Sequence, residues 1–234
     1  MSLHNLTTFK ATVDHRLHET VVDILAPGTR QPVARLAKAG PMIRPGAYVL
    51  LTGPGLAEVT AHLTPSGAQH VDGAPIGVIN LSGSARTDAA IHPLNGSRHS
   101  PVVHNPARWR VVQPGLPVLT GKALGSTRLH HNRIADLQDR PYLDMIPYPV
   151  PNLLMLMRFR FSAPDSAGFT VQYRRGRPHI EVTVNEPRLD RRLVFAAITA
   201  LIATNMWSPG EELTGMLAPF RRKSRDRMPP RRTD

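Results

Sequence analysis

The stretch Leu193–Ala203, LVFAAITALIA, decides the fold expected of this chain because it has no polar face. Thr199 is its one polar residue, and its composition and length are typical of a helix. A helix that is apolar all round must be covered by protein on every side. The run has 11 residues, and a membrane-spanning helix needs about 20. We therefore predict that it lies inside a protein core.

Charged and helix-breaking residues mark both ends of this helix. Asn185 or Glu186 can lead into it, and Pro187 suits a first turn, where its missing N–H leaves no hydrogen bond unmade. Ser208-Pro209-Gly210 ends it. We expect a central helix over about residues 188–206.

Short runs of alternating apolar and polar residues, separated by turn residues, precede the helix. Such alternation predicts β-strands with one face in the core. The last runs, 153–161, 169–174 and 180–185, predict an antiparallel meander. The other expected strands are 9–14, 19–25, 32–38, 47–52, 56–63, 75–81, 108–113 and 117–119. Residues 82–106 predict a long polar loop, and residues 122–150 predict no clear element.

An enclosed helix that follows antiparallel strands has few possible surroundings. One is the centre of a β-barrel that is too wide for side chains alone to fill. The 23 prolines and 17 glycines agree with this fold, because they favour many short elements over a helical bundle. We therefore expect a mainly β chain, a β-barrel that encloses one hydrophobic C-terminal helix.

The segment 180–202 resembles the closing strand and central helix of the tubby C-terminal-like superfamily, which includes tubby-like proteins, phospholipid scramblases and LURP-one-related proteins. Ile76-Gly77-Val78-Ile79 is similar to a recurrent short strand of that group, and Arg108-Trp109-Arg110-Val111-Val112 to its later aromatic strand. The strong part of the resemblance covers residues 150–207. It implies about twelve antiparallel strands, and binding of phosphoinositides or other acidic lipids.

The resemblance and the composition of the chain end together predict the domain organisation. Residues 1–207 are expected to form one barrel domain, and residues 208–234 a C-terminal extension whose basic tail from residue 221 is disordered. This extension departs from the superfamily, in which the helix lies close to the chain end. No lipid-contacting residue is carried over, because the basic residues of the superfamily form no motif that aligns here.

The formal charge of +12 favours anionic partners such as nucleic acid, acidic lipid or acidic protein. The chain has 25 arginines and 4 lysines, a ratio that a coding bias also produces. The candidate ligand-binding residues lie near the last strands and the helix entrance, where they can gather on one rim of the barrel and contact phosphate oxygens. They are Arg158, Arg160, Arg174, Arg175, Arg177, Arg188, Arg191 and Arg192.

Two alternatives to this interpretation stay open. Arg158 and Arg160 can simply form the solvent face of a half-buried strand. The basic tail can contact an acidic membrane or nucleic acid, or it can serve solubility alone. Its candidate contact residues are Arg221, Arg222, Lys223, Arg225 and Arg227.

No pattern in the sequence indicates a catalytic site. The chain has no cysteine, and its histidines lack the spacing of a metal site, so we predict no metal and no cofactor. Gly121-Lys122-Ala123 fails as a phosphate loop, since Gly115 is one residue too far upstream and no Ser or Thr follows the lysine. Glu181 and Glu186 are not expected to act as a catalytic carboxylate pair.

We therefore expect a non-enzymatic barrel that binds an anionic ligand or acidic lipid head groups at a membrane surface. The alternatives are a scaffold that binds another protein through loops such as 82–106, or weak nucleic-acid binding through the tail. An aromatic content of 5% makes base stacking the weaker alternative. Without a signal peptide or an apolar span in the sequence, the expected location is cytoplasmic, peripheral to the membrane.

Overall fold

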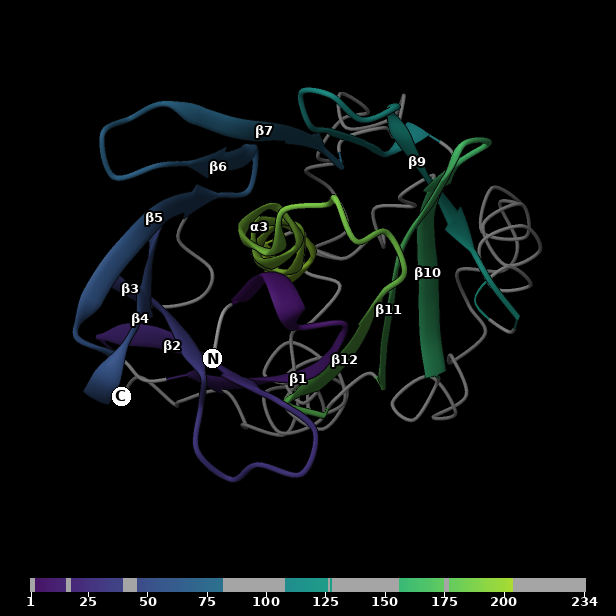
Figure 1. Cartoon of the computed structure of the whole chain (residues 1–234). Coiled ribbons are helices and arrows are strands. Elements are labelled where there is room, and N and C mark those ends of the chain that lie inside the picture. Colours follow the sequence, from purple (N-terminus) through teal and green to yellow (C-terminus); the bar gives the residue numbers. More distant parts are fainter. Residues whose placement is uncertain are drawn as a thin grey trace, which may run out of the picture.

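The computed structural model describes residues 3–15, 18–39, 46–81, 108–125, 127, 156–174 and 177–203. In this part of the chain, twelve strands form one closed antiparallel barrel around an α-helix (Figure 1). The prediction of a mainly β fold, with about twelve antiparallel strands that enclose one hydrophobic C-terminal helix, is confirmed.

The strands follow one another around the barrel in chain order, and β1 closes it by pairing with β12. Every neighbouring pair is antiparallel, so the closed wall leaves no strand edge unpaired. The elements are η1 (Leu3–Asn5), β1 (Thr8–His15), β2 (Glu19–Leu25), β3 (Ala34–Ala39), β4 (Tyr48–Thr52), η2 (Pro54–Leu56), β5 (Glu58–Thr64), β6 (Gly67–Gln69), β7 (Pro75–Asn80), β8 (Arg110–Val112), β9 (Leu119–Ala123), β10 (Leu156–Ala163), β11 (Ser166–Arg174), β12 (His179–Val184) and α3 (Arg191–Ala203).

The alternation along each strand determines which side chains face the helix. In β10, Met157, Phe159 and Phe161 are buried, whereas Arg158 and Arg160 are exposed. Successive side chains of a strand point to opposite faces, so the polar residues of the meander come together on the outside of the barrel. This outer face carries the candidate site described below.

Helix α3 fills the barrel, as its apolar sequence predicts. Every residue from Leu193 to Ile202 is at most 2% exposed, and Thr199 satisfies its hydroxyl by donating to the carbonyl of Ala196. The helix begins at Arg191, three residues after the expected start, because the carboxylate of Asp190 accepts the N–H of Arg192 at 2.9 Å as an N-cap. Residues 204–206 of the expected helix lie outside the described residues.

The space between helix and wall is filled in two ways. On β7, a Cβ at Gly77 would lie 2.7 Å from a methyl group of Leu193, so glycine allows the helix to approach the strand closely. On the side of β8, β10 and β11, aromatic rings fill the interior. Phe161 stacks on Phe169 with ring centroids 4.6 Å apart and on Trp109 at 6.0 Å.

Two elements differ from the sequence-based prediction. Strand β6 was not predicted, because its three residues are too few to show alternation. Strand β9 continues to Ala123 and so takes in the start of the segment 122–150, for which no clear element was predicted. The predicted loop 82–106 lies outside the described residues.

Candidate anion-binding site

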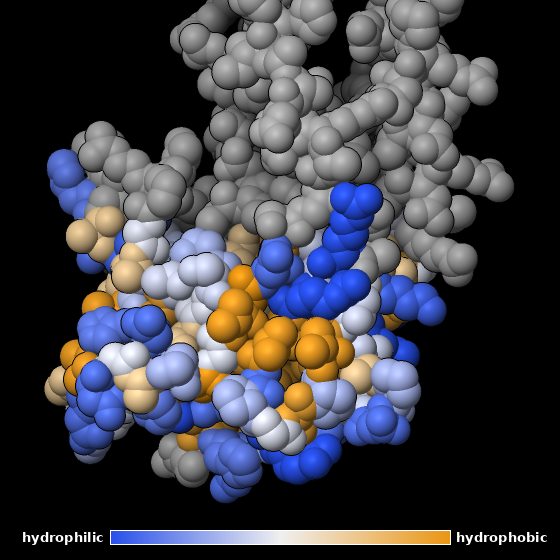
Figure 2. All heavy atoms as spheres, turned by 90° about the horizontal axis from the view of Figure 1, so that it is seen from above, coloured by the Kyte–Doolittle hydropathy of each residue, from blue (hydrophilic) through white to orange (hydrophobic). Residues whose placement is uncertain are grey.

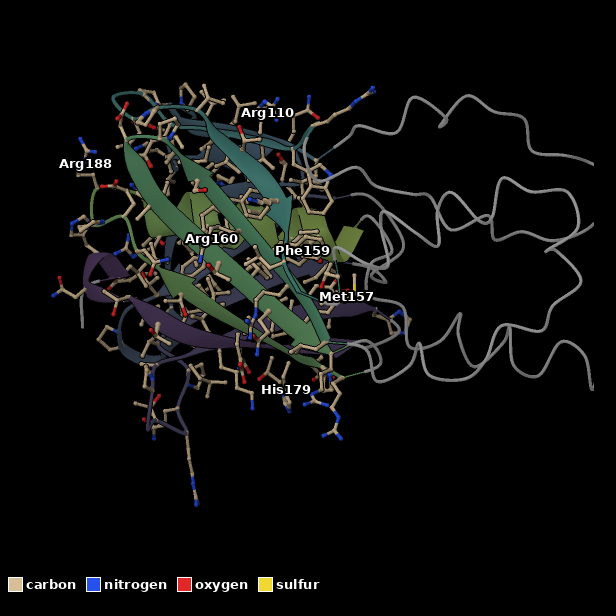
Figure 3. The ribbon with its side chains drawn as sticks, turned by 90° about the vertical axis from the view of Figure 1, so that its right-hand side faces the viewer. Arg110, Met157, Phe159, Arg160, His179 and Arg188 are labelled. Atoms are coloured by element: carbon tan, nitrogen blue, oxygen red, sulfur yellow. The ribbon has the colours of Figure 1, made fainter. Side chains whose placement is uncertain are left out.

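The described arginines among those singled out in the sequence do not gather on one rim of the barrel, so that expectation is wrong for them. Arg174 and Arg177 lie on either side of the β11–β12 connection, and Arg188 lies beyond the opposite end of β12. Arg160 lies between these ends, on the outer face of β10 (Figure 3). An antiparallel meander separates residues in this way because consecutive connections alternate between the two ends of the sheet.

Arg191 is a structural residue of the helix entrance. It is 3% exposed, and its guanidinium donates to the carbonyls of Leu6 at 2.8 Å, Glu186 at 3.4 Å and Leu189. Burial lowers the pKa of this guanidinium, and the charge of Asp190 opposes that effect. Its hydrogen-bonding capacity is used to tie the helix entrance to the N-terminal segment, so Arg191 does not belong to an exposed ligand site.

The other two entrance arginines have acidic partners. Nε of Arg188 donates to Glu186 at 2.9 Å, and Ser166 donates to the second carboxylate oxygen at 2.8 Å. The hydrogen bond from Arg188, followed by that from Ser166, lowers the pKa of Glu186 to about 2. Arg192 forms a 2.6 Å ion pair with Asp190. This end of the barrel is therefore largely neutralised internally.

The outer face of β9–β12 is arranged differently, in rows of side chains that cross the strands. One row contains Arg158, Gln172 and Glu181, linked by hydrogen bonds. Nε of Arg158 donates to Gln172 at 2.8 Å, and the amide nitrogen of Gln172 donates to Glu181 at 3.2 Å. Lys10 on β1 lies opposite Glu181 in the same row. The carboxylate thus offsets part of the positive charge here.

The next row, two residues along each strand, has two cations and no acid. Lys122 on β9 is the direct cross-strand neighbour of Arg160, and Thr170 and Thr183 continue the row on β11 and β12. Lys122 and Arg160 are both exposed, and neither forms an ion pair or hydrogen bond to another described side chain. These four residues form the cationic row.

Two shallow grooves meet at Arg160. The first, with a volume of about 340 Å³, is lined by Arg158, Thr170 and Thr183, among others. The second, of about 660 Å³, runs along the β10–β11 turn. Arg160 and Asn185 line both grooves, and the carboxylates that border them, Glu181 and Asp165, form no ion pair with Arg160.

This arrangement offers the chemistry of an oxyanion site. The planar guanidinium presents paired N–H donors, the neighbouring ammonium adds a point charge, and hydroxyls and an amide supply further donors. In the described ranges, no three His, Asp or Glu side chains lie close enough together to hold a metal ion. No helix among the described residues has the length and apolar character needed to cross a bilayer.

Lys122 is the site residue that the sequence analysis missed. It was considered only within Gly121-Lys122-Ala123, which fails as a phosphate loop. The alternation of β9, with Leu119 and Ala123 buried and Lys122 exposed, is the signal that places it outside the barrel. Its closeness to Arg160 follows from the β9–β10 pairing, and the 32 residues between the two strands hide that pairing from sequence inspection.

Several predicted contact residues lie outside the part of the chain that the structure describes. These are Arg175, the tail residues Arg221, Arg222, Lys223, Arg225 and Arg227, and the whole of the loop 82–106. The roles proposed for the tail in membrane or nucleic-acid contact, and for the loop in protein binding, stay predictions. The chain matches no family model, and comparisons with curated proteins and with solved structures find no significant match.

Proposed function

We propose that this barrel is a non-enzymatic protein that binds a phosphate-bearing anion, of the kind that acidic lipid head groups present, at the cationic row. The observation that supports this most is the pair of opposed cations, Lys122 and Arg160, without an acidic partner among the described residues. The anion would bind where Arg160 and Thr170 line the first groove, beside the ammonium group of Lys122 on the neighbouring strand.

The position of the two cations argues for a ligand more strongly than exposure alone does. Like charges directly opposite each other on adjacent strands destabilise a sheet, whereas opposite charges in the same positions stabilise it by about 0.2–1 kcal/mol. The neighbouring row of the same wall avoids this cost, since Arg158 donates to Gln172 and Lys10 faces Glu181. A dianionic phosphate group would turn the repulsion between Lys122 and Arg160 into attraction to a shared ligand.

The rest of the row suits a tetrahedral oxyanion. Thr170, the direct neighbour of Arg160 on β11, offers a hydroxyl that can donate to an oxygen which Arg160 does not reach. The hydrogen-bonded row beside it, Arg158–Gln172–Glu181, fixes the lateral limit of the groove. Because Glu181 repels anions, we expect the ligand to lie toward Lys122 and not toward β12.

Titration with inorganic pyrophosphate, followed by amide NMR shifts, tests this function. Arg160→Gln and Lys122→Gln should each weaken binding about tenfold, because a charge-assisted hydrogen bond contributes about 1.5–3 kcal/mol. The matched control is Arg174→Gln, which removes one charge from the exposed end of β11 and should leave the affinity within about twofold. Equal affinity for wild type and both site variants would refute the proposal.

A further inference from the structure

A second surface feature lies on the same wall, three exposed valines in one line across the strands. Val78 on β7 pairs directly with Val112 on β8. Continuing the β8–β9 register, in which Val111 faces Leu119, places Val118 opposite Val112. Their exposures are 55%, 37% and 46%. Val78, Val112 and Val118 form the valine row.

The valine row is unusual for its position on the outside of the barrel. The outward positions of strands are ordinarily polar when they face water, and grouped exposed apolar side chains mark contact sites. On the other side of Val78 the pairing partner is Gly67, which has no side chain to cover it. Figure 2, which views the barrel from above relative to Figure 1, shows an apolar patch with hydrophilic side chains around it.

The valine row and the cationic row are two levels of one surface. Val118, just before β9, and Thr120 and Lys122 on β9 all point outward, so the outward side chains change along the chain from apolar through polar to cationic. At about 3.3 Å per residue, the four steps from Val118 to Lys122 span roughly 13 Å. Arg110, the neighbour of Thr120 on β8, adds a basic side chain at the intermediate level.

We propose that this surface docks on an anionic lipid bilayer, with the valine row at the boundary between head groups and acyl chains. This inference rests on the proposed function, because it makes lipid phosphate the ligand of the cationic row. Apolar side chains of proteins that lie on membranes enter about 5–10 Å into that boundary. A separation of roughly 13 Å along the strand, tilted to the membrane, leaves Lys122 at the level of the phosphates.

A bilayer fits this surface better than a folded protein partner does. The three valines lie along a row and present no aromatic anchor, whereas protein interfaces concentrate their energy in aromatic and arginine anchors that fill pockets. A bilayer requires no such complementarity. The net charge of +12 and the basic residues beside the row favour an acidic surface. An acidic apolar protein segment is the competing occupant, and the test below separates it.

The absence of cysteine from the chain allows a site-specific test of insertion. Val118→Cys and Val59→Cys are a matched pair, because Val59 on β5 is 44% exposed and Val118 is 46% exposed. Each is labelled with a polarity-sensitive dye and mixed with vesicles of phosphatidylcholine alone or with phosphatidylglycerol. We expect a blue shift only at position 118 and only with the anionic vesicles. A shift of the same size at both positions, or at neither, would overturn the proposal.

Co-sedimentation with the same vesicles measures the contribution of the valine row. Replacing Val78, Val112 and Val118 together by serine should lower binding to anionic vesicles about tenfold or more, because apolar surface no longer leaves water. Val59→Ser should leave it unchanged. Each variant is checked by circular dichroism for a wild-type melting curve. Undiminished vesicle binding by the folded triple variant would refute docking through this row.

Pyrophosphate titration of the same proteins distinguishes the two proposals. The serine variants should bind pyrophosphate as wild type does, since they leave the cationic row intact. Wild type that binds pyrophosphate but sediments with neither kind of vesicle would refute the bilayer and leave the anion site standing, with an acidic protein segment as the partner to test. Wild type that does not bind pyrophosphate at the cationic row would refute the proposed function itself.

Discussion

The cations at the entrance of α3 and those on the outer wall differ in whether the protein itself supplies their ion-pair and hydrogen-bond partners. At the entrance, Arg188 and Arg192 have carboxylate partners, and Arg191 donates to buried carbonyls. On the wall, Lys122 and Arg160 face each other without an acidic partner among the described residues. The same residue types therefore have structural roles at one place and are available to a ligand at the other.

Burial explains this difference. Groups removed from water must find partners inside the protein, because an unpaired buried polar group or charge is costly. Glu186 and Arg191 are both buried, so their partners are built in. Exposed cations are solvated and tolerate the absence of a partner, so nothing in folding requires the arrangement on the wall. Three pairs of substitutions test this comparison.

The largest expected effect is on stability at the entrance. Arg191→Leu leaves the buried carbonyls of Leu6 and Leu189 without their donor, so the free energy of unfolding should fall by about 3 kcal/mol or more. Arg160→Leu makes the same exchange on the exposed wall and should change it by less than about 0.5 kcal/mol. Urea unfolding measures both variants. Similar losses for the two would remove the distinction between structural and available arginines.

A smaller, pH-dependent effect on the free energy of unfolding is expected on replacing Glu186. Its pKa of about 2 lies below the ordinary value of 4.5, so the carboxylate stabilises the fold above pH 4.5, and this contribution is lost as pH falls toward 2. Glu186→Gln should cost about 1–3 kcal/mol at pH 7, and the difference from wild type should shrink over that pH range. Urea unfolding at several pH values measures it.

The control for that series is Glu181→Gln, which removes a carboxylate from the exposed wall. Its hydrogen bond comes from Gln172 at 3.2 Å, and the effect of losing it should stay below about 1 kcal/mol at pH 7. If the difference in unfolding free energy between wild type and Glu186→Gln did not change with pH, the ionised carboxylate of Glu186 would not stabilise the helix entrance.

The smallest effect is expected on the wall, and it has the opposite sign. Lys122→Glu places a carboxylate opposite Arg160, so it should stabilise the barrel by about 0.2–1 kcal/mol while it abolishes pyrophosphate binding. Lys10→Glu is the reverse control, because it places a second carboxylate opposite Glu181 and should destabilise by a similar amount. If Lys122→Glu instead destabilised the barrel, Lys122 and Arg160 would not repel each other in the wild-type protein.

The parts of the fold that sequence predicts well are those with a local signal. The alternation of Met157 to Phe161 and the apolar run after Leu193 each indicate their element and the side that is buried. Elements without such a signal were missed, as β6 shows with three residues, and the helix start was displaced because Asp190 and not Pro187 determines it.

The candidate site was predicted only in part, for the same reason. Arg160 was identified correctly as an outward residue of a basic strand, but the rim expected to collect all the arginines does not exist. Lys122 and the valine row have no local pattern that indicates a site. They become neighbours through pairing between strands, and cross-strand contacts depend on register, which the local sequence does not state.

The sequence by itself determined that the helix, which has no polar side, must be enclosed, and that strands with alternating apolar and polar residues must enclose it. The reason is that exposing the apolar side chains of either the helix or the strands to water is unfavourable. Tertiary structure decided which polar residues meet on the outside. The register of β9 against β10 brings Lys122 to Arg160, and that of β7 against β8 brings Val78 to Val112. Outward side chains make no contribution to the core, so only the pairing of the whole barrel fixes their neighbours.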